Sequence, residues 1–110
     1  MAVWRRICDL NDFPRLGART VCTEAGPIAV FRTRDDRVFA LADKCPHRGG
    51  PLSQGIVHGA RVTCPLHDMV IDLETGRAVA PDEGAARTFK TRVVDGGIEI
   101  ILERSRAVAE

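Results

Sequence analysis

Short runs of hydrophobic and β-branched residues alternate with polar stretches that contain glycine and proline along the whole chain. The runs recur about every ten residues, which is typical of an all-β sandwich or barrel. No stretch of about a dozen residues has the period of an amphipathic helix. We predict strands at residues 3–8, 18–23, 28–31, 38–42, 61–63, 69–72, 88–94 and 98–102.

The polar stretches between these runs contain the residues that favour turns. They lie at residues 11–14, 25–27, 34–37 and 95–97. The last of them, Asp95-Gly96-Gly97, joins two strand-like runs and predicts a hairpin. Within 88–94 the alternation predicts that Phe89 points inward and that Lys90 and Arg92 point outward.

Length and charge narrow the class of protein. The 110 residues predict a single domain, 1–110. Sixteen basic residues balance 15 acidic ones, so we expect neither nucleic acid nor a membrane surface as the main partner. No apolar run reaches the roughly 18 residues needed to span a bilayer. Residues 1–10 lack the apolar core of a signal peptide, so we expect a cytoplasmic protein. In the cytoplasm, clustered Cys and His residues more often bind metal than form disulfides.

All three histidines and two of the four cysteines lie between Lys44 and Pro81. The segment Cys45-Pro46-His47 has the spacing C-x-H, and Cys64-Pro65-Leu66-His67 has the spacing C-x-x-H. Each segment offers one thiolate and one imidazole, and two such loops can close a four-ligand metal site. The prolines stiffen the ligand loops. We expect the metal-binding region to span about residues 43–82.

The mixed ligands indicate which metal is bound. A structural zinc site usually pairs two like ligands in each half. In a Rieske centre two cysteines hold one iron and two histidines hold the other. We therefore predict a Rieske-type [2Fe–2S] cluster held by Cys45, His47, Cys64 and His67, with no catalytic residue. A zinc-stabilised binding module is the alternative from another class.

With these four residues the chain resembles the Rieske family. Three stretches also resemble the small subunit of assimilatory NAD(P)H-dependent nitrite reductases, namely 48–59, 72–76 and 81–84. The resemblance implies an antiparallel β-sandwich or barrel whose two ligand loops form a cluster-binding subdomain. It also implies electron transfer with a large flavin and sirohaem subunit. Ferredoxins of ring-hydroxylating oxygenases are similar in size and motif, so a free-standing Rieske ferredoxin for such a system is the alternative.

The same resemblance predicts the reduction potential. High-potential Rieske proteins carry a second cysteine in each ligand loop and a tyrosine that hydrogen-bonds to sulfur. The matching positions here are Gly50 and Leu66, and the chain has no tyrosine. Fewer hydrogen bonds to the sulfurs stabilise the reduced cluster less. We therefore predict a low-potential, ferredoxin-like centre.

Several other residues invite a functional interpretation but are expected to be structural. Cys8 and Cys22 lie in strand-like runs and are predicted to be small buried core residues. Trp4 and Met69 are predicted to fill the core. His58 is predicted to be an exposed turn residue and a poor metal ligand.

Overall fold

The computed structural model describes residues 2–24, 26–44, 50–65, 69–79 and 84–103. Its elements are β1 (Ala2–Asp9), η1 (Leu10–Asp12), β2 (Ala18–Thr23), β3 (Gly26–Arg32), β4 (Val38–Ala42), η2 (Leu52–Gln54), β5 (Ile56–His58), β6 (Arg61–Thr63), β7 (Val70–Asp72), β8 (Thr88–Phe89), β9 (Thr91–Val94) and β10 (Gly97–Glu103). The two η elements are single 3₁₀ turns. All the strand pairs are antiparallel, so the predicted all-β class is confirmed.

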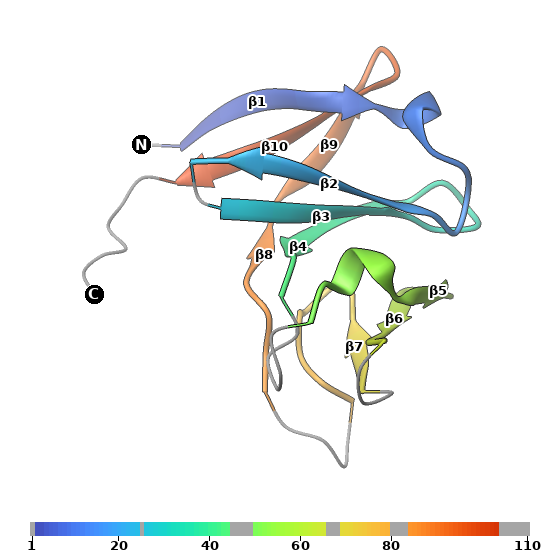
Figure 1. Cartoon of the computed structure of the whole chain (residues 1–110). Helices are drawn as coiled ribbons and strands as arrows, with labels where there is room; N and C mark the ends of the chain where they lie inside the picture. The colour runs from blue at the N-terminus through green and yellow to red at the C-terminus, as the bar shows by residue number, and fades with distance from the viewer. Residues whose placement is uncertain (1, 25, 45–49, 66–68, 80–83, 104–110) are drawn as a thin grey trace.

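Two of the three sheets in the described part of the chain form a sandwich. One has the strand order β1-β10-β9, and the other has the order β2-β3-β4-β8 (Figure 1). Between them lies a core to which both sheets contribute side chains, including Ile28 and Val30 from β3 and Ile98 and Ile100 from β10. These two sheets together are called the base.

The third sheet, β5-β6-β7, lies against the other face of the β2-β3-β4-β8 sheet (Figure 1). Successive side chains of a strand point to opposite faces, so β3 serves both cores. Ile28 and Val30 contact the sandwich core, whereas Ala29 and Phe31 contact a second core shared with the third sheet. All four side chains are fully buried, which makes β3 the central strand of the fold.

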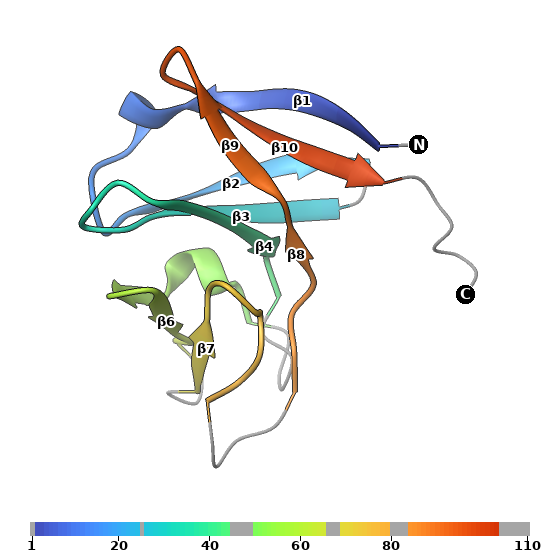
Figure 2. The same cartoon turned by 180° about the vertical axis from the view of Figure 1, so that it is seen from behind.

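The run 88–94 was predicted as one strand, but it divides into β8 and β9. β8 pairs with β4 and β9 pairs with β10, so the chain crosses from one sheet to the other at Lys90 (Figure 2). The Lys90 carbonyl accepts a hydrogen bond from the Ile101 amide at 3.1 Å, which fixes the crossing to β10. The predicted orientations are confirmed, because Phe89 is buried and Lys90 and Arg92 are exposed.

The predicted hairpin at 95–97 is confirmed. Val94 pairs with Gly97, and the two residues between them, Asp95 and Gly96, have φ values of 51° and 78°. Two successive positive φ values are the geometry of a type I′ turn, which suits the twist of the paired strands. β5 was not among the predicted strands, and His58 is the last residue of that strand rather than a turn residue, although it is exposed as predicted.

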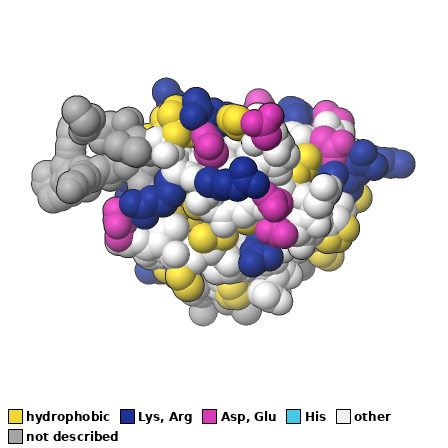
Figure 3. Space-filling view, turned by 90° about the horizontal axis from the view of Figure 1, so that it is seen from above, with side chains coloured by type: hydrophobic (Ala, Val, Ile, Leu, Met, Phe, Trp, Pro, Cys, Tyr) yellow, Lys and Arg dark blue, Asp and Glu magenta, His cyan; other side chains and the backbone are white. Residues whose placement is uncertain are grey.

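The predictions that Cys22 and Trp4 lie in the core are wrong. Cys22 is exposed, whereas Cys8 is half-buried and packs beside the sandwich core. Trp4 lies opposite Ile101 on the outer face of the β1-β10-β9 sheet, with the Arg92 guanidinium 4.1 Å from its ring centre. Seen from above in Figure 3, basic and acidic side chains are interspersed on the molecule. No single sign of charge dominates that view.

Among the described residues, none of the helices has the length and apolar character needed to cross a bilayer.

Candidate metal centre

The first predicted ligand loop leaves the end of β4 and returns to η2. Cys45 and His47 lie outside the described residues, but both bases of their loop are described. At the entry, the Asp43 amide donates to the Pro27 carbonyl at 3.0 Å. At the return, Gly50 and Leu52 are buried, and the 3₁₀ turn η2 is closed by a hydrogen bond from the Gly55 amide to the Leu52 carbonyl at 2.9 Å.

A carboxylate joins the two bases of this loop. Asp43 Oδ1 accepts a hydrogen bond from the Ser53 amide at 2.8 Å, and Asp43 Oδ2 accepts one from the Ser53 hydroxyl at 2.7 Å. Thr20 Oγ1 on β2 lies 2.8 Å from the same Oδ2. None of these three residues was predicted from the sequence. Their one sequence signal is that Asp43 and Ser53 lie on either side of the motif.

The second ligand loop joins β6 to β7. Cys64 is described, and it is fully buried at the end of β6. Its amide donates to the Met69 carbonyl at 2.7 Å, so the two ends of the loop are closed against each other. His67 lies inside this loop and outside the described residues. Met69 is buried in the core, as predicted.

The described segments on either side of residues 80–83 are joined to β7 and to each other. The Val79 amide donates to the Val70 carbonyl at 2.8 Å, and the Ala78 amide donates to the Gly84 carbonyl at 2.9 Å. Isolated bridges join Ile71 to Ala78 and Arg77 to Ala85. These contacts hold residues 77–79 and 84–85 close to β7, the strand that follows the second ligand loop. Residues 80–83 themselves, including Pro81, lie outside the described part of the chain.

One core joins the bases of the two ligand loops. Leu52, which follows the first loop, and Cys64 and Met69, which bound the second, belong to the same cluster of buried side chains. This cluster also includes Phe31 and Leu41 from the base. Within the described residues no three His, Cys, Asp or Glu side chains form a metal site, and three of the four predicted ligands lie outside them.

The described surroundings fit an iron–sulfur cluster. Cys64 supplies a thiol, the soft donor that iron–sulfur clusters use, at a fully buried position. The backbone beside it is held by the short Cys64–Met69 hydrogen bond and by Pro65. Buried surroundings of this kind limit the access of water to a bound metal centre.

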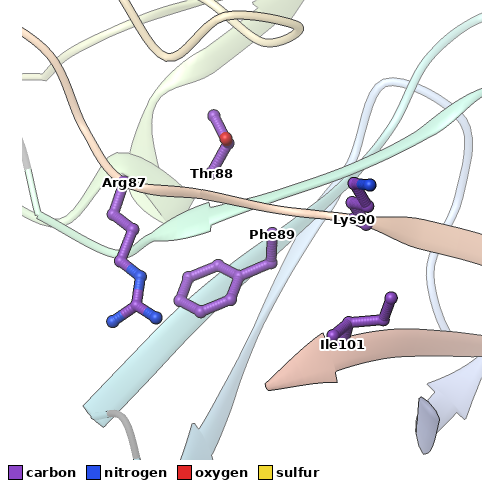
Figure 4. A pocket seen from close by; sticks show the side chains of 5 residues that line it. All are labelled: Arg87, Thr88, Phe89, Lys90 and Ile101. Carbon is purple, nitrogen blue, oxygen red and sulfur yellow. The ribbon is translucent and has the colours of Figure 1, made fainter. Parts of the chain in front are cut away.

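A separate hollow of about 220 Å³ lies at the β8–β9 crossing. Arg87 and Phe89 point to one side of the chain and Thr88 points to the other, while Ile101 of β10 lies below Lys90 (Figure 4). The Arg87 guanidinium stacks 4.8 Å from the Phe89 ring centre. The hollow is therefore lined by two apolar side chains, one threonine and two basic residues, and its lining includes none of the predicted ligands.

Comparison with known proteins identifies the family. The family model of the Rieske-like [2Fe-2S] domain matches residues 3–101. This chain belongs to the Rieske family. It is 36% identical to the anthranilate 1,2-dioxygenase ferredoxin subunit of Burkholderia cepacia over 101 residues, which cover 91% of this chain and 93% of that one.

Solved structures share the fold of this Rieske protein. The ferredoxin of Sphingomonas yanoikuyae B1 superposes with a TM-score of 0.81 at 25% identity, over 92% of this chain and all of that one (100%). A protein assigned as the small subunit of an NADH-dependent nitrite reductase in Mycobacterium tuberculosis superposes with a TM-score of 0.85. Its identity is 22%, over 96% of this chain and 99% of that one, so this likeness shows the fold alone.

The family assignment decides the class of protein. This Rieske protein is an electron-transfer ferredoxin with a [2Fe–2S] cluster as its cofactor. The iron–sulfur prediction is confirmed at the level of the family. When bound, the cluster accepts and donates one electron at a time.

Proposed function

We propose that Cys45, His47, Cys64 and His67 hold the cluster. The support is the chemistry of the donor set, two thiolates and two imidazoles, together with the one core that joins the bases of both ligand loops. Cys64 is packed in the core that the β5-β6-β7 sheet shares with the base, and hydrogen bonds at the ends of both ligand loops restrict the adjoining segments. Iron and acid-labile sulfide in a two-to-two ratio per chain, lost in Cys64→Ala, is the expected result.

We further propose that this ferredoxin is the small subunit of an assimilatory NAD(P)H-dependent nitrite reductase. The observation that carries the proposal is the resemblance in 48–59, 72–76 and 81–84, stretches within or next to the predicted metal-binding region 43–82 in the sequence. In the described part of these stretches the chain forms η2, β5 and the turn after β7. The partner is then a large subunit with flavin and sirohaem, and the chain itself contains no catalytic residue.

A second candidate function has its own support. The 36% identity to a dioxygenase ferredoxin subunit extends over nearly the full length of both chains. Under this alternative the ferredoxin passes electrons to the oxygenase component of a ring-hydroxylating system. Both candidates require the same cluster and differ only in the protein that receives the electron.

One experiment separates the two candidates. The purified holoprotein is added to the large nitrite reductase subunit of the same organism, and nitrite-dependent NAD(P)H oxidation is measured. The nitrite reductase proposal predicts that the ferredoxin restores activity and co-purifies with the large subunit. Absence of both effects, with electron delivery to an oxygenase component instead, would overturn it in favour of the second candidate.

A further inference from the structure

Asp43 is a point where four separate parts of the chain meet. The residue follows β4, its amide donates to the Pro27 carbonyl on β3, and its side chain contacts η2 and β2. Asp43 is half-buried, and it lies two residues before Cys45. Membership of the Rieske family does not by itself explain why these segments meet at Asp43.

The hydrogen bonds around this carboxylate are short and use both of its oxygens. Oδ1 accepts from the Ser53 amide at 2.8 Å, and Oδ2 lies 2.7 Å from the Ser53 hydroxyl and 2.8 Å from the Thr20 hydroxyl. The two hydroxyl oxygens are 2.9 Å apart. Each hydroxyl has one proton, so two protons serve the three oxygen–oxygen contacts. The carboxylate can accept both protons, and bonds of this charge-assisted kind are stronger than neutral ones.

The network ties the first ligand loop at both ends. Asp43 precedes the loop and Ser53 follows it, so their two hydrogen bonds close the segment 44–52 as a ring. Thr20 then fastens that ring to β2, a strand of the base. The loop is therefore connected to the base by side chains as well as by its own backbone.

The second ligand loop is held differently. It is closed by the backbone bond between Cys64 and Met69, and both side chains are buried in the shared core. The first loop has a buried anchor at its return, Leu52, but its entry passes through half-buried Asp43 and exposed Lys44. The entry therefore depends on the carboxylate network to a degree that the second loop does not.

We infer that Asp43, with Thr20 and Ser53, is a positioning group that holds the first ligand loop closed and so determines how firmly the cluster is retained. The inference rests on the proposed ligands Cys45 and His47. Loss of the carboxylate removes three hydrogen bonds at the loop base and lets the entry of the loop move. The cluster is then released faster, without a matching loss of the β-sandwich.

The test compares variants of the full-length holoprotein. Asp43→Ala removes the carboxylate and its three hydrogen bonds. Thr20→Val is a milder variant of similar shape that removes only the connection to β2. Asp36→Asn is the matched control, because Asp36 lies before the other end of β4 and binds Arg15 and Arg32 rather than the ligand loop. Three quantities are recorded: the rate of iron release to a chelator without denaturant, the far-UV circular dichroism melt, and the electron paramagnetic resonance line shape of the reduced protein.

The expected result is iron release about tenfold faster in Asp43→Ala, with a smaller increase in Thr20→Val and broader resonance lines in both. Asp36→Asn lowers the melting temperature but leaves the release rate and the line shape unchanged. Release in Asp43→Ala that equals wild type, or that rises only in proportion to unfolding, overturns the inference. Wild-type protein that contains zinc, or no acid-labile sulfide, refutes the proposed function itself and is recognised before any variant is compared.

Discussion

Gly55 allows the chain between η2 and β5 to lie directly against β6. Its φ and ψ of −82° and −179° are extended values that any residue can adopt, so an alanine there causes no backbone strain. A Cβ at this position, however, would overlap the Thr63 carbonyl oxygen and lie 2.9 Å from Val62 Cγ2. Carbon atoms in good contact are about 3.5 Å or more apart, so the two segments would have to separate by about half an ångström or more.

Gly55→Ala is therefore expected to act on both stability and the cluster. Forcing an extra methyl group into a packed site costs about 1–3 kcal/mol, which lowers the apparent Tm by roughly 10 °C. Because Cys64 directly follows Thr63, the displacement also moves a proposed cluster ligand. We expect less iron per chain after reconstitution and faster bleaching of the visible absorbance.

Gly59→Asn is the control in the same hairpin. Gly59 has a φ of +58°, and a Cβ there would meet no atom within 4 Å. Asparagine tolerates positive φ better than most residues, so we expect a change in stability below about 1 kcal/mol and a normal iron content. Far-UV melts and iron analysis of both variants check the prediction. A Gly55→Ala protein with wild-type Tm and iron content would refute the packing argument.

Three further predictions follow from the side chains and from the ligand loops. Hydrogen bonds from Arg15 and Arg32 lower the pKa of Asp36 from 3.8 to about 2, so the ionised carboxylate stabilises the fold above pH 4 and this stabilisation is lost as the pH falls towards 2. The Tm difference between wild type and Asp36→Asn should therefore shrink from pH 6 to pH 3, and a difference independent of pH would contradict the assignment. Exposed Cys22 should react with a maleimide before Cys8, whose pKa is raised by burial, and mass spectrometry of Cys22→Ser should show slow labelling at Cys8. A redox titration should give a midpoint in the lower part of the roughly −150 to +300 mV Rieske range, and a midpoint near its top would contradict the expectation of few hydrogen bonds to the sulfurs.

Much of the fold could be predicted from the sequence because most strands have clear boundaries. The predicted ranges 18–23, 38–42 and 61–63 coincide with β2, β4 and β6. Each is a run of β-formers that ends at turn residues, so local preference and tertiary structure agree. β5 has no such pattern, since it is three residues long and only Val57 is buried. Ile56 on that strand is 71% exposed, which no hydrophobic pattern could predict.

The remaining errors arise from long-range packing. The division of 88–94 depends on which sheet each half meets, and a continuous alternation along the strand carries no such information. Cys22 shares a strand face with Ala18 and Thr20. Ala18 packs against the shared core and Thr20 contacts Ser53, but neither η2 nor the third sheet buries Cys22.

The candidate site also has features that the sequence predicts and features that it does not. The ligand types and their spacing could be predicted from the sequence, because soft and imidazole donors in a C-x-H and C-x-x-H pattern restrict the possible metals. The groups that hold the loops could not, because Thr20 lies 23 residues before Asp43 and Asp43 ten before Ser53. Such contacts become visible only when the sheet brings these segments together.

Pulsed electron paramagnetic resonance of the dithionite-reduced protein tests the central claim most directly. Two histidines on one iron of a [2Fe–2S] cluster predict strong couplings to two imidazole nitrogens, with one of them lost in His47→Cys and the other in His67→Cys. A reduced cluster with no histidine nitrogen coupling, or a protein with no resonance and no iron, would contradict the account.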